Sequence, residues 1–345
     1  MKKIVKIGGR EIGDDKPCCF MAEIGGNYKD FKEAKILIDS AKRAGVEVIK
    51  FQTFEADTIT TKNNQFDMES TGKVNQYELF KKLEPDKRVQ ELLHTHSFQT
   101  GLMAITSPSH MKDLEFIDSL NPIAYKVGSD LARHIPLLKK IAKTGKPIIL
   151  STGMCSLMEI NDSICEIKRE GNHNIILMHC ISDYPAKIKE ANLKVIPMLK
   201  EMFDLPVGFS DHSIGPELSI AAVTLGANMI ERHFFDENIK YGSDYLLSSN
   251  EQEYKNIITS SRIIESALGD GNKQPSKSEL KNLKTNRVSV ISKKDISAGT
   301  KITEDMIDVR RPGTGLEPRL IDQVLGKEAI INIKKGVPLE WEMLQ

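Results

Sequence analysis

Eight short apolar runs alternate with amphipathic stretches between about Cys18 and Leu268, and this alternation constrains the fold more than any other feature of the chain. The runs are rich in Ile and Val and lack period-two alternation, as expected of parallel strands that are covered on both faces. They are Cys19–Ile24, Val46–Phe51, Gly101–Thr106, Ala124–Val127, Pro147–Leu150, Ile175–His179, Pro206–Phe209 and Asn228–Glu231.

Helical patterns separate these runs, as in Phe31–Ala44, where apolar residues recur at helix spacing. Eight strand–helix units over about 250 residues match the size of a (β/α)8 (TIM) barrel. A doubly wound sheet is the alternative, but it usually has fewer strands and a glycine-rich first turn. Gly25-Gly26-Asn27 is not the G-x-G-x-x-G of that turn. We therefore predict a TIM barrel over residues 1–270.

The chain changes character after Gly269. Gly271, Pro275 and several lysines indicate an exposed linker over residues 271–284. Residues 285–345 form a separate module, predicted to be small, mostly β and pseudo-symmetric, which must lean on the barrel or on another chain because it buries little surface. Its internal repeat has an offset of 37 residues: Ile296, Gly299, Ile302, Met306 and Ile307 recur as Ile333, Gly336, Leu339, Met343 and Leu344.

Charge and cysteine usage exclude several classes of protein. The chain has 48 basic and 48 acidic residues, so no net field favours nucleic acid or an anionic membrane. No stretch reaches the roughly 20 apolar residues of a membrane helix, and no signal peptide is expected. The five cysteines lack C-x-x-C spacing, which favours reduced core residues in a cytoplasmic protein.

Two clusters, Ser210-Asp211-His212 and Glu231-Arg232-His233, each follow an apolar run. Imidazoles at the ends of neighbouring parallel strands meet at one rim of a barrel, where they can bind one transition-metal ion. Two protein nitrogens leave open positions for substrate, as a catalytic metal requires. Asp211 and Glu231 could support that ion directly or through water.

Lys50 and Lys126 end two further strands, where an ammonium group is costly unless it meets an anion. With hydroxyls on the same rim they could bind a phosphate or carboxylate. An ion pair with a barrel glutamate and Schiff-base chemistry are the alternatives. Glu23 ends the first strand and could act as a general acid or base, or neutralise a lysine. The hydroxyls are those of Ser107, Ser129, Ser151 and Ser210.

A polar insertion, Glu55–Tyr77, follows the second run. An active-site lid or a dimer contact would each explain it. Tyr184 and Asp244 lie on loops where they could orient a ligand, and Arg311 precedes a Pro-Gly turn from which it could reach out of the small module.

Taken together, these motifs resemble the sialic acid synthase family, whose members join phosphoenolpyruvate to an N-acetylated aldose. The resemblance spans nearly the whole chain and rests on many motifs in one order. They include Glu23-Ile24-Gly25, Lys50-Phe51-Gln52-Thr53, Tyr125-Lys126-Val127-Gly128-Ser129, Ser151-Thr152-Gly153-Met154, His179-Cys180 with Tyr184-Pro185, Ser210-Asp211-His212-Ser213, Glu231-Arg232-His233-Phe234 and Arg310-Arg311-Pro312-Gly313.

The resemblance implies a TIM barrel followed by an antifreeze-like (SAF) domain, in a domain-swapped homodimer whose Arg311 completes the partner's site. It implies a cytoplasmic transferase that uses a divalent metal ion, Mn²⁺, or else Mg²⁺ or Co²⁺. His212 and His233 would bind this ion directly, and Glu231 would support these ligands without binding the ion itself. The expected catalytic residues are Glu23, Lys50, Lys126 and Tyr184. The expected substrate-binding residues are Gln52, Ser107, Ser129, Ser151, Ser182, Ser210, Asp244 and Arg311.

The chain departs from the family pattern at three places, all flanking the sugar side of the expected site. Tyr28 replaces a histidine, Ser182 replaces a frequent asparagine of the phosphate site, and 241–245 replaces a Gly-Pro-Asp-rich stretch. The resemblance implies N-acetylmannosamine as the aldose, whereas these departures favour a 2,4-diacetamido hexose that gives a legionaminic- or pseudaminic-type product. In either case we expect a nine-carbon 3-deoxy ulosonic acid plus phosphate, formed by C–O cleavage. A Schiff-base or metal-dependent aldolase or lyase is the alternative function, and a catalytically inactive barrel is less consistent with the intact rim residues.

Overall fold

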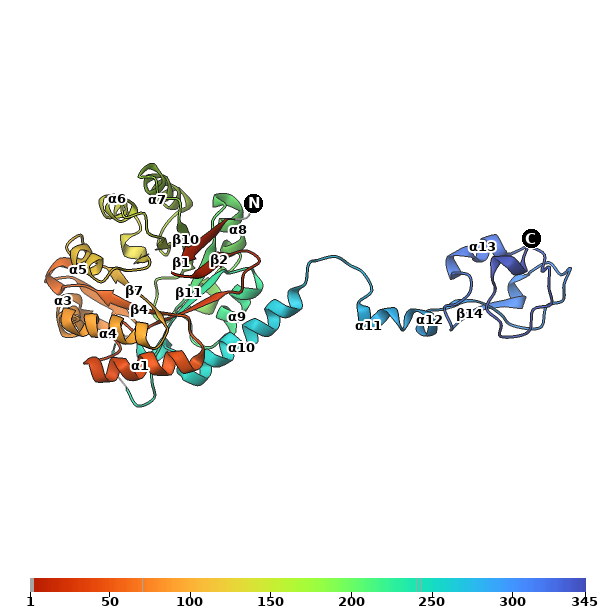
Figure 1. Cartoon of the computed structure of the whole chain (residues 1–345), viewed down its shortest axis with the longest axis horizontal. Coiled ribbons are helices and arrows are strands. Elements are labelled where there is room, and N and C mark those ends of the chain that lie inside the picture. Colours follow the sequence, from red (N-terminus) through yellow and green to blue (C-terminus); the bar gives the residue numbers. More distant parts are fainter. Residues whose placement is uncertain (1–2, 70, 240, 243) are drawn as a thin grey trace. The chain divides into compact units, whose positions relative to one another are not determined.

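The computed structural model describes residues 3–69, 71–239, 241–242 and 244–345. It divides into two compact units, one ending at Gly269 and the other beginning at Asp270 (Figure 1). Each unit has its own buried core.

The first unit contains one sheet of eight parallel strands, in the spatial order β7-β4-β3-β12-β11-β10-β9-β8. The strands at the two ends of this order, β7 and β8, also contact each other, which closes the sheet into a barrel. The predicted TIM barrel is thus confirmed. Its strands are β3 (Cys19–Glu23), β4 (Val48–Thr53), β7 (Met103–Pro108), β8 (Tyr125–Val127), β9 (Ile148–Ser151), β10 (Ile175–Cys180), β11 (Val207–Asp211) and β12 (Met229–His233).

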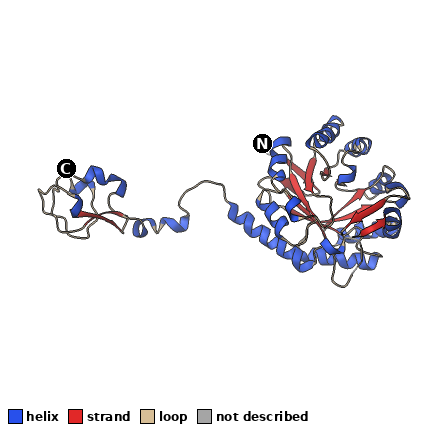
Figure 2. Cartoon of the chain, turned by 180° about the vertical axis from the view of Figure 1, so that it is seen from behind, coloured by secondary structure: helices blue, strands red, loops and turns tan. Residues whose placement is uncertain are grey.

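Helices cover the outside of this barrel (Figure 2). The first, α1 (Phe31–Ala44), coincides with its predicted range because both ends are capped. The Asp30 carboxylate accepts a hydrogen bond from the Glu33 N–H, and Gly45 ends the helix in the left-handed region, at φ 93°. The others are α4 (Lys87–Gln99), α5 (Asp113–Ser119), α6 (Ile135–Ala142), α7 (Leu157–Arg169), α8 (Val195–Phe203), α9 (Glu217–Thr224) and α10 (Glu251–Leu268), with short 3₁₀ turns η1 (Ser129–Leu131), η2 (Ile188–Glu190) and η3 (Tyr245–Leu247).

An N-terminal hairpin, β1 (Ile4–Ile7) and β2 (Arg10–Gly13), was not predicted. Its Val5, Ile7 and Ile12 are fully buried and pack with inward-facing barrel residues such as Met21 and Met178. The amino-terminal end of the barrel interior is therefore filled with apolar side chains, and the polar groups collect at the other end.

The insertion after β4 has regular structure of its own. It contains α2 (Ala56–Ile59), the antiparallel strands β5 (Gln65–Met68) and β6 (Gly72–Asn75), and α3 (Gln76–Leu83). Within the insertion, residue 70 lies outside the described residues.

The second unit shows the predicted internal repeat. Ile296 and Ile333 exchange both backbone hydrogen bonds, each of 2.8 Å. The 3₁₀ turns η4 (Glu304–Met306) and η6 (Trp341–Met343) are also related by the offset of 37 residues. The remaining elements are β13 (Ser289–Ser292), β14 (Ile307–Arg310), η5 (Pro318–Leu320), α13 (Ile321–Val324) and, within the predicted linker, α11 (Lys277–Leu280) and α12 (Leu283–Asn286).

The buried histidine of α4 makes the stability of the first unit pH-dependent. Burial lowers the pKa of His94 to about 4, and its ring packs on Phe51 with 5.3 Å between centroids. Because the unfolded chain binds the proton more readily, stability falls as the pH drops from about 6.5 to about 4, by up to on the order of 3 kcal/mol.

We predict that His94→Leu loses less stability than the wild type over this pH interval. Urea unfolding at pH 7 and pH 5 measures the difference, and His173→Gln, which removes an exposed histidine, is the matched control. Equal losses in the His94→Leu variant and the wild type would contradict the prediction.

Candidate active site

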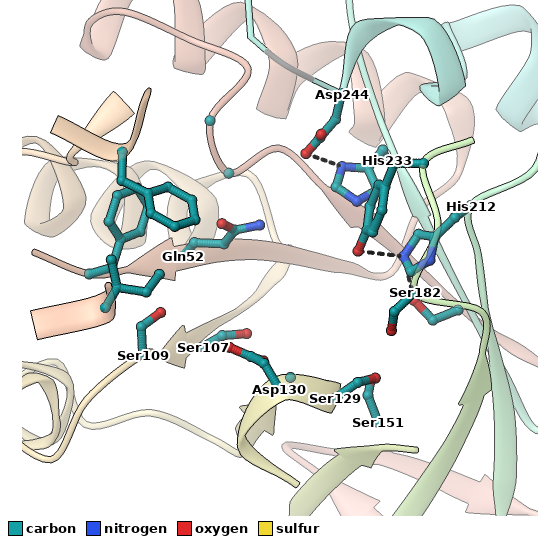
Figure 3. Close-up of a pocket in the computed structure, with 18 of the residues that line it drawn as sticks. Gln52, Ser107, Ser109, Ser129, Asp130, Ser151, Ser182, His212, His233 and Asp244 are labelled. Carbon is teal, nitrogen blue, oxygen red and sulfur yellow. Dashed lines mark hydrogen bonds and ion pairs between the residues drawn. The ribbon is translucent and has the colours of Figure 1, made fainter. Parts of the chain in front are cut away.

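A cavity of about 480 Å³ lies at the carboxyl ends of the barrel strands (Figure 3). In a TIM barrel this is the end that carries the active site. Most of the site residues predicted from the sequence line it. They are Lys50, Gln52, Ser107, Lys126, Ser129, Ser151, Ser182, Tyr184, Ser210, His212, Glu231, His233 and Asp244.

The two predicted metal-binding histidines face each other, with 5.6 Å between their ring centroids. His212 follows the last residue of β11, and its Nδ1 donates to the Ile181 carbonyl at 2.8 Å, because a carbonyl can only accept. Nε2 of the neutral ring therefore keeps its lone pair, which points towards the hydroxyls of Ser210 and Tyr184, each 3.4 Å away. The Tyr184 ring stacks on His212, with 4.4 Å between centroids.

His233 is the last residue of β12 and is equally buried. Its Nδ1 lies 3.4 Å from an Asp244 carboxylate oxygen, which is long for a hydrogen bond, and has no hydrogen-bond partner within the described part of the chain. Burial lowers the pKa of both histidines to about 4, and for His212 the neighbouring His233 adds to this effect. Both imidazoles are neutral at pH 7.

Neutral, incompletely satisfied imidazoles fit a transition-metal ion, which binds the deprotonated ring. They supply two nitrogen ligands; no group of three His, Cys, Asp or Glu in the described residues is arranged to hold a metal. Such an ion would therefore need substrate or water to complete its coordination. Asp211 and Glu231, which we expected as supports of that ion, have other partners.

Four buried charges of alternating sign, Glu23, Lys50, Glu231 and Lys126, form what we call the charge row. Lys50 Nζ contacts a Glu23 carboxylate oxygen and lies 3.2 Å from Glu231 Oε1. Lys126 Nζ lies 3.0 Å from Glu231 Oε2 and donates to Ser151 Oγ at 2.7 Å. The second Glu23 oxygen accepts from the Gly25 N–H. The ion pair with a barrel glutamate, one alternative for the lysines, is therefore present.

The charge row favours the charged forms of Lys50 and Glu231. Burial acts to lower the pKa of Lys50, but Glu23 and Glu231 outweigh it and raise that pKa above its usual value. For Glu231, burial is outweighed by Lys126 and Lys50, which lower its pKa. An ammonium group of this kind is a poor Schiff-base nucleophile, because that reaction needs the neutral amine.

Hydroxyl groups extend the charge row into the cavity. Ser129 Oγ accepts from the Gly153 N–H at 2.9 Å and lies 3.1 Å from Cys180 Sγ. Ser107 Oγ is buried and has no hydrogen-bond partner within the described residues. An unpaired buried hydroxyl is costly, so a ligand oxygen at this position would stabilise the site.

A second buried ion pair, between Arg232 and Asp211, joins the two segments that carry the histidines. Arg232 Nη1 donates to Asp211 Oδ2 at 2.6 Å, and its other nitrogens donate to Ser249 Oγ and to the Ser213 carbonyl. The remaining Asp211 oxygen accepts from Ser213, and Ser219 also donates to the carboxylate. Asp211 therefore positions the chain on either side of His212 and does not face the cavity.

One predicted catalytic residue, Glu23, lies elsewhere than expected, and some lining residues were missed. Glu23 does not line the cavity but sits behind Lys50. Arg311 is exposed in the second unit, after β14, and Ser243 lies outside the described residues. Asp130 and Ser109 line the cavity and were not predicted, although Asp130 follows the predicted Ser129 and Ser109 follows Pro108, the last residue of β7.

Apolar side chains of 54–83 also line the cavity and were not predicted. Because the segment is polar in composition, its sequence did not indicate that these side chains would line a cavity.

Within the described residues, none of the helices combines the length and the apolar composition that a membrane-spanning helix needs.

A TIM barrel with ionisable side chains converging on the carboxyl ends of its strands has the arrangement of an enzyme. Comparison with known proteins identifies the family. Residues 37–273 match the NeuB family model and residues 287–345 match the SAF domain model. The chain belongs to the NeuB family of sialic acid synthases, and it is an enzyme.

Named relatives and solved structures agree with this assignment. The chain is 38% identical to the N,N'-diacetyllegionaminic acid synthase of Campylobacter jejuni, over 93% of this chain and 98% of that protein. It is 36% identical to the pseudaminic acid synthase of the same species, over 94% of this chain and 96% of that protein. The crystal structure of the N-acetylneuraminic acid synthetase of Leptospira borgpetersenii, in complex with citrate, has a TM-score of 0.72 at 29% identity, over 82% of this chain and 96% of that one.

We predict that Arg232→Met destabilises the protein by about 3–5 kcal/mol, because it leaves the Asp211 carboxylate buried without its cation. Adding Asp211→Asn should recover part of this loss. Urea unfolding measures both, and Arg262→Met, which breaks half-exposed ion pairs with Glu47 and Glu265, is the control, with a cost of about 1 kcal/mol or less. A loss in Arg232→Met no larger than that of the control would contradict the prediction.

Proposed function

We propose that the protein condenses phosphoenolpyruvate with the open-chain form of an N-acetylated aldose, giving a nine-carbon 3-deoxy ulosonic acid and phosphate. The observation that carries this proposal is the charge row. Its last member, Lys126, donates to Ser151, which lines the same cavity as the two neutral imidazoles. The names of the relatives, which are synthases of legionaminic, pseudaminic and N-acetylneuraminic acid, support the same class of reaction.

Phosphoenolpyruvate would bind along the charge row. Lys126 and the hydroxyls of Ser129 and Ser151 present donors for its phosphate, and Lys50 presents a second ammonium group. Because both lysines are already fixed by carboxylates, little reorganisation is needed when the anion arrives. Ser107, Ser182 and Ser210 line the same cavity and complete the predicted set of hydroxyls.

The aldose would bind with its aldehyde beside the histidines and its other groups near Gln52, Tyr184 and Asp244. We propose that His212 and His233 hold a divalent cation, such as Mn²⁺, Mg²⁺ or Co²⁺. When bound, it supplies Lewis acidity that polarises the aldehyde. The tautomer that Ile181 imposes on His212 keeps the required lone pair available.

In the proposed reaction, the methylene carbon of phosphoenolpyruvate forms a bond to the aldehyde carbon. Water adds to the carbon that bears the phosphate, and the C–O bond to phosphate then breaks. One water proton ends on the former aldehyde oxygen and the other on the phosphate. Glu23, which we expected as a general acid or base, lies behind Lys50 and holds its ammonium group in place, and Lys126 stabilises the departing phosphate.

The assay that tests this function is phosphate release from phosphoenolpyruvate with a panel of N-acetylated hexosamines. We expect release that EDTA stops and Mn²⁺ restores, and His212→Gln should lower kcat/KM at least about a hundredfold. His173→Gln is the control on the protein surface. Retained activity in EDTA, with inactivation by borohydride, would indicate a Schiff-base aldolase instead.

The bond that breaks can be followed with ¹⁸O in the bridging oxygen of phosphoenolpyruvate. Because water attacks carbon, the label should leave with the released phosphate. Label retained in the ulosonic acid would show attack at phosphorus and would rule out the proposed order of bond changes.

We further propose that the protein is a domain-swapped homodimer in which Arg311 of one chain reaches the sugar in the partner's barrel. Exposed apolar side chains follow the carboxyl ends of β9 to β12: Met158, Ile188, Ile214 and Leu246, which are 57–75% exposed. Exposed apolar side chains in four successive segments at this end of the barrel support a contact with another chain.

Co-expression of two inactive variants tests this assembly. In a domain-swapped dimer of His212→Ala and Arg311→Ala chains, one of the two sites combines an intact barrel with an intact Arg311, so the mixture should regain about a quarter of wild-type activity. The separately purified variants are the controls. Activity no higher than their sum would contradict the exchange of domains.

A further inference from the structure

Asp244 and His233 face each other across the cavity from two different segments of the chain. His233 ends β12, whereas Asp244 lies on the loop that follows, just before η3. Both side chains line the cavity, with 3.4 Å between Asp244 Oδ2 and His233 Nδ1 (Figure 3). This arrangement requires a group that fixes the two segments relative to each other.

The buried side chain of Asn27 connects these segments. Asn27 lies in the loop between β3 and α1 and is 1% exposed. Its Nδ2 donates to the Phe234 carbonyl at 3.0 Å and to Ser248 Oγ at 3.3 Å. Because a carbonyl can only accept, the amide nitrogen must face Phe234. Phe234 directly follows His233, so this hydrogen bond holds the segment that carries the histidine.

Ser248 extends the second hydrogen bond to the segment that carries the aspartate. Its hydroxyl accepts from Asn27 and donates to the Asp244 backbone carbonyl at 2.7 Å. A hydroxyl can donate one hydrogen bond and accept another at the same time. The amide of Asn27 therefore holds the histidine segment with one hydrogen and, through Ser248, the aspartate segment with the other.

The loop that carries Asp244 also packs directly on Asn27. Gly242 has a φ of 106°, in the left-handed region, and a Cβ at this position would collide with Asn27 Oδ1 and with the Gly26 carbonyl. Asn27 Oδ1 is buried and accepts no hydrogen bond within the described residues. Because a buried acceptor without a partner costs stability, this atom favours a role for the amide beyond stability.

We propose that Asn27 is a positioning residue, which holds Asp244 opposite His233 and thereby strengthens the binding of the aldose. This inference rests on the proposed function, in which Asp244 lies beside the aldose. Asn27 itself lies outside the lining of the cavity, so it acts through Ser248 and Asp244. A short side chain with two hydrogens on one nitrogen is needed for this role, and neither a carboxylate nor a hydroxyl provides it.

The test measures the KM for the aldose and the KM for phosphoenolpyruvate separately in the phosphate-release assay. It uses the full-length protein with Mn²⁺ and the N-acetylated hexosamine that the wild type uses best. Asn27→Leu has a similar branched shape but cannot donate either hydrogen bond. We expect its aldose KM to rise about tenfold, because Asp244 is no longer held in place, and its phosphoenolpyruvate KM to change by less than about twofold.

Asn172→Leu is the matched control. Asn172 is also buried, at 3% exposed, and its Nδ2 donates to the Ala142 and Lys146 carbonyls. It precedes β10, at the end of the barrel opposite to the cavity. This variant should lower the midpoint of urea unfolding much as Asn27→Leu does, with both KM values unchanged. An equal rise of the aldose KM in both variants would show a general loosening of the protein and overturn the inference.

A double-mutant cycle tests the path through Ser248. Ser248→Ala should also raise the aldose KM, whereas Ser248→Thr, which keeps the hydroxyl, should restore it. Adding Asn27→Leu to Ser248→Ala should raise the aldose KM little further, because both substitutions break the same link. The two Ser248 variants still test the inference if Asn27→Leu does not fold.

The outcomes separate this inference from the proposed function. An unchanged aldose KM in Asn27→Leu, or additive effects in the cycle, would overturn the inference and leave the proposed function intact. Failure of the wild type to release phosphate with any N-acetylated hexosamine would overturn the proposed function, and this inference with it.

Discussion

The charge row is the interaction on which the rest of the site depends. Lys126 comes from β8, whereas its partner Glu231 lies on β12, so the ion pair joins opposite sides of the barrel mouth. Both lysines are buried, and breaking one ion pair would leave the other partner uncompensated. The carboxylates that raise the pKa of Lys50 keep its ammonium group available to bind an anion and make it a poor nucleophile.

The barrel supplies the geometry that this chemistry requires. Parallel strands end at one rim, so Glu23 and His233, which are far apart in the chain, are register partners on neighbouring strands. Apolar side chains of the N-terminal hairpin fill the opposite end, which confines the polar groups to the mouth. Asp211 and Arg232, which immediately precede His212 and His233, form a buried ion pair, and the two neutral rings face each other.

Much of the site could be predicted from the sequence, because a polar residue that ends an apolar run must lie at the rim of a parallel barrel. This reasoning placed His233 at the end of β12. Lys50 and Lys126 also line the cavity, but they lie within β4 and β8 and not at the strand ends that we predicted for them. It could not assign the partners of Glu231 or Asp211, since both carboxylates can face either the cavity or a neighbouring strand. The apolar residues of 54–83 that line the cavity were missed because they lie in elements of four to eight residues with polar composition, where periodicity carries little information.

Diffraction from crystals grown with Mn²⁺ and phosphoenolpyruvate, recorded at the manganese absorption edge, tests the central claim most directly. We expect an anomalous peak between His212 and His233, with the phosphate of phosphoenolpyruvate bound to Lys126 and Ser151. A peak bound by other residues, or a phosphate that does not contact the charge row, would contradict it.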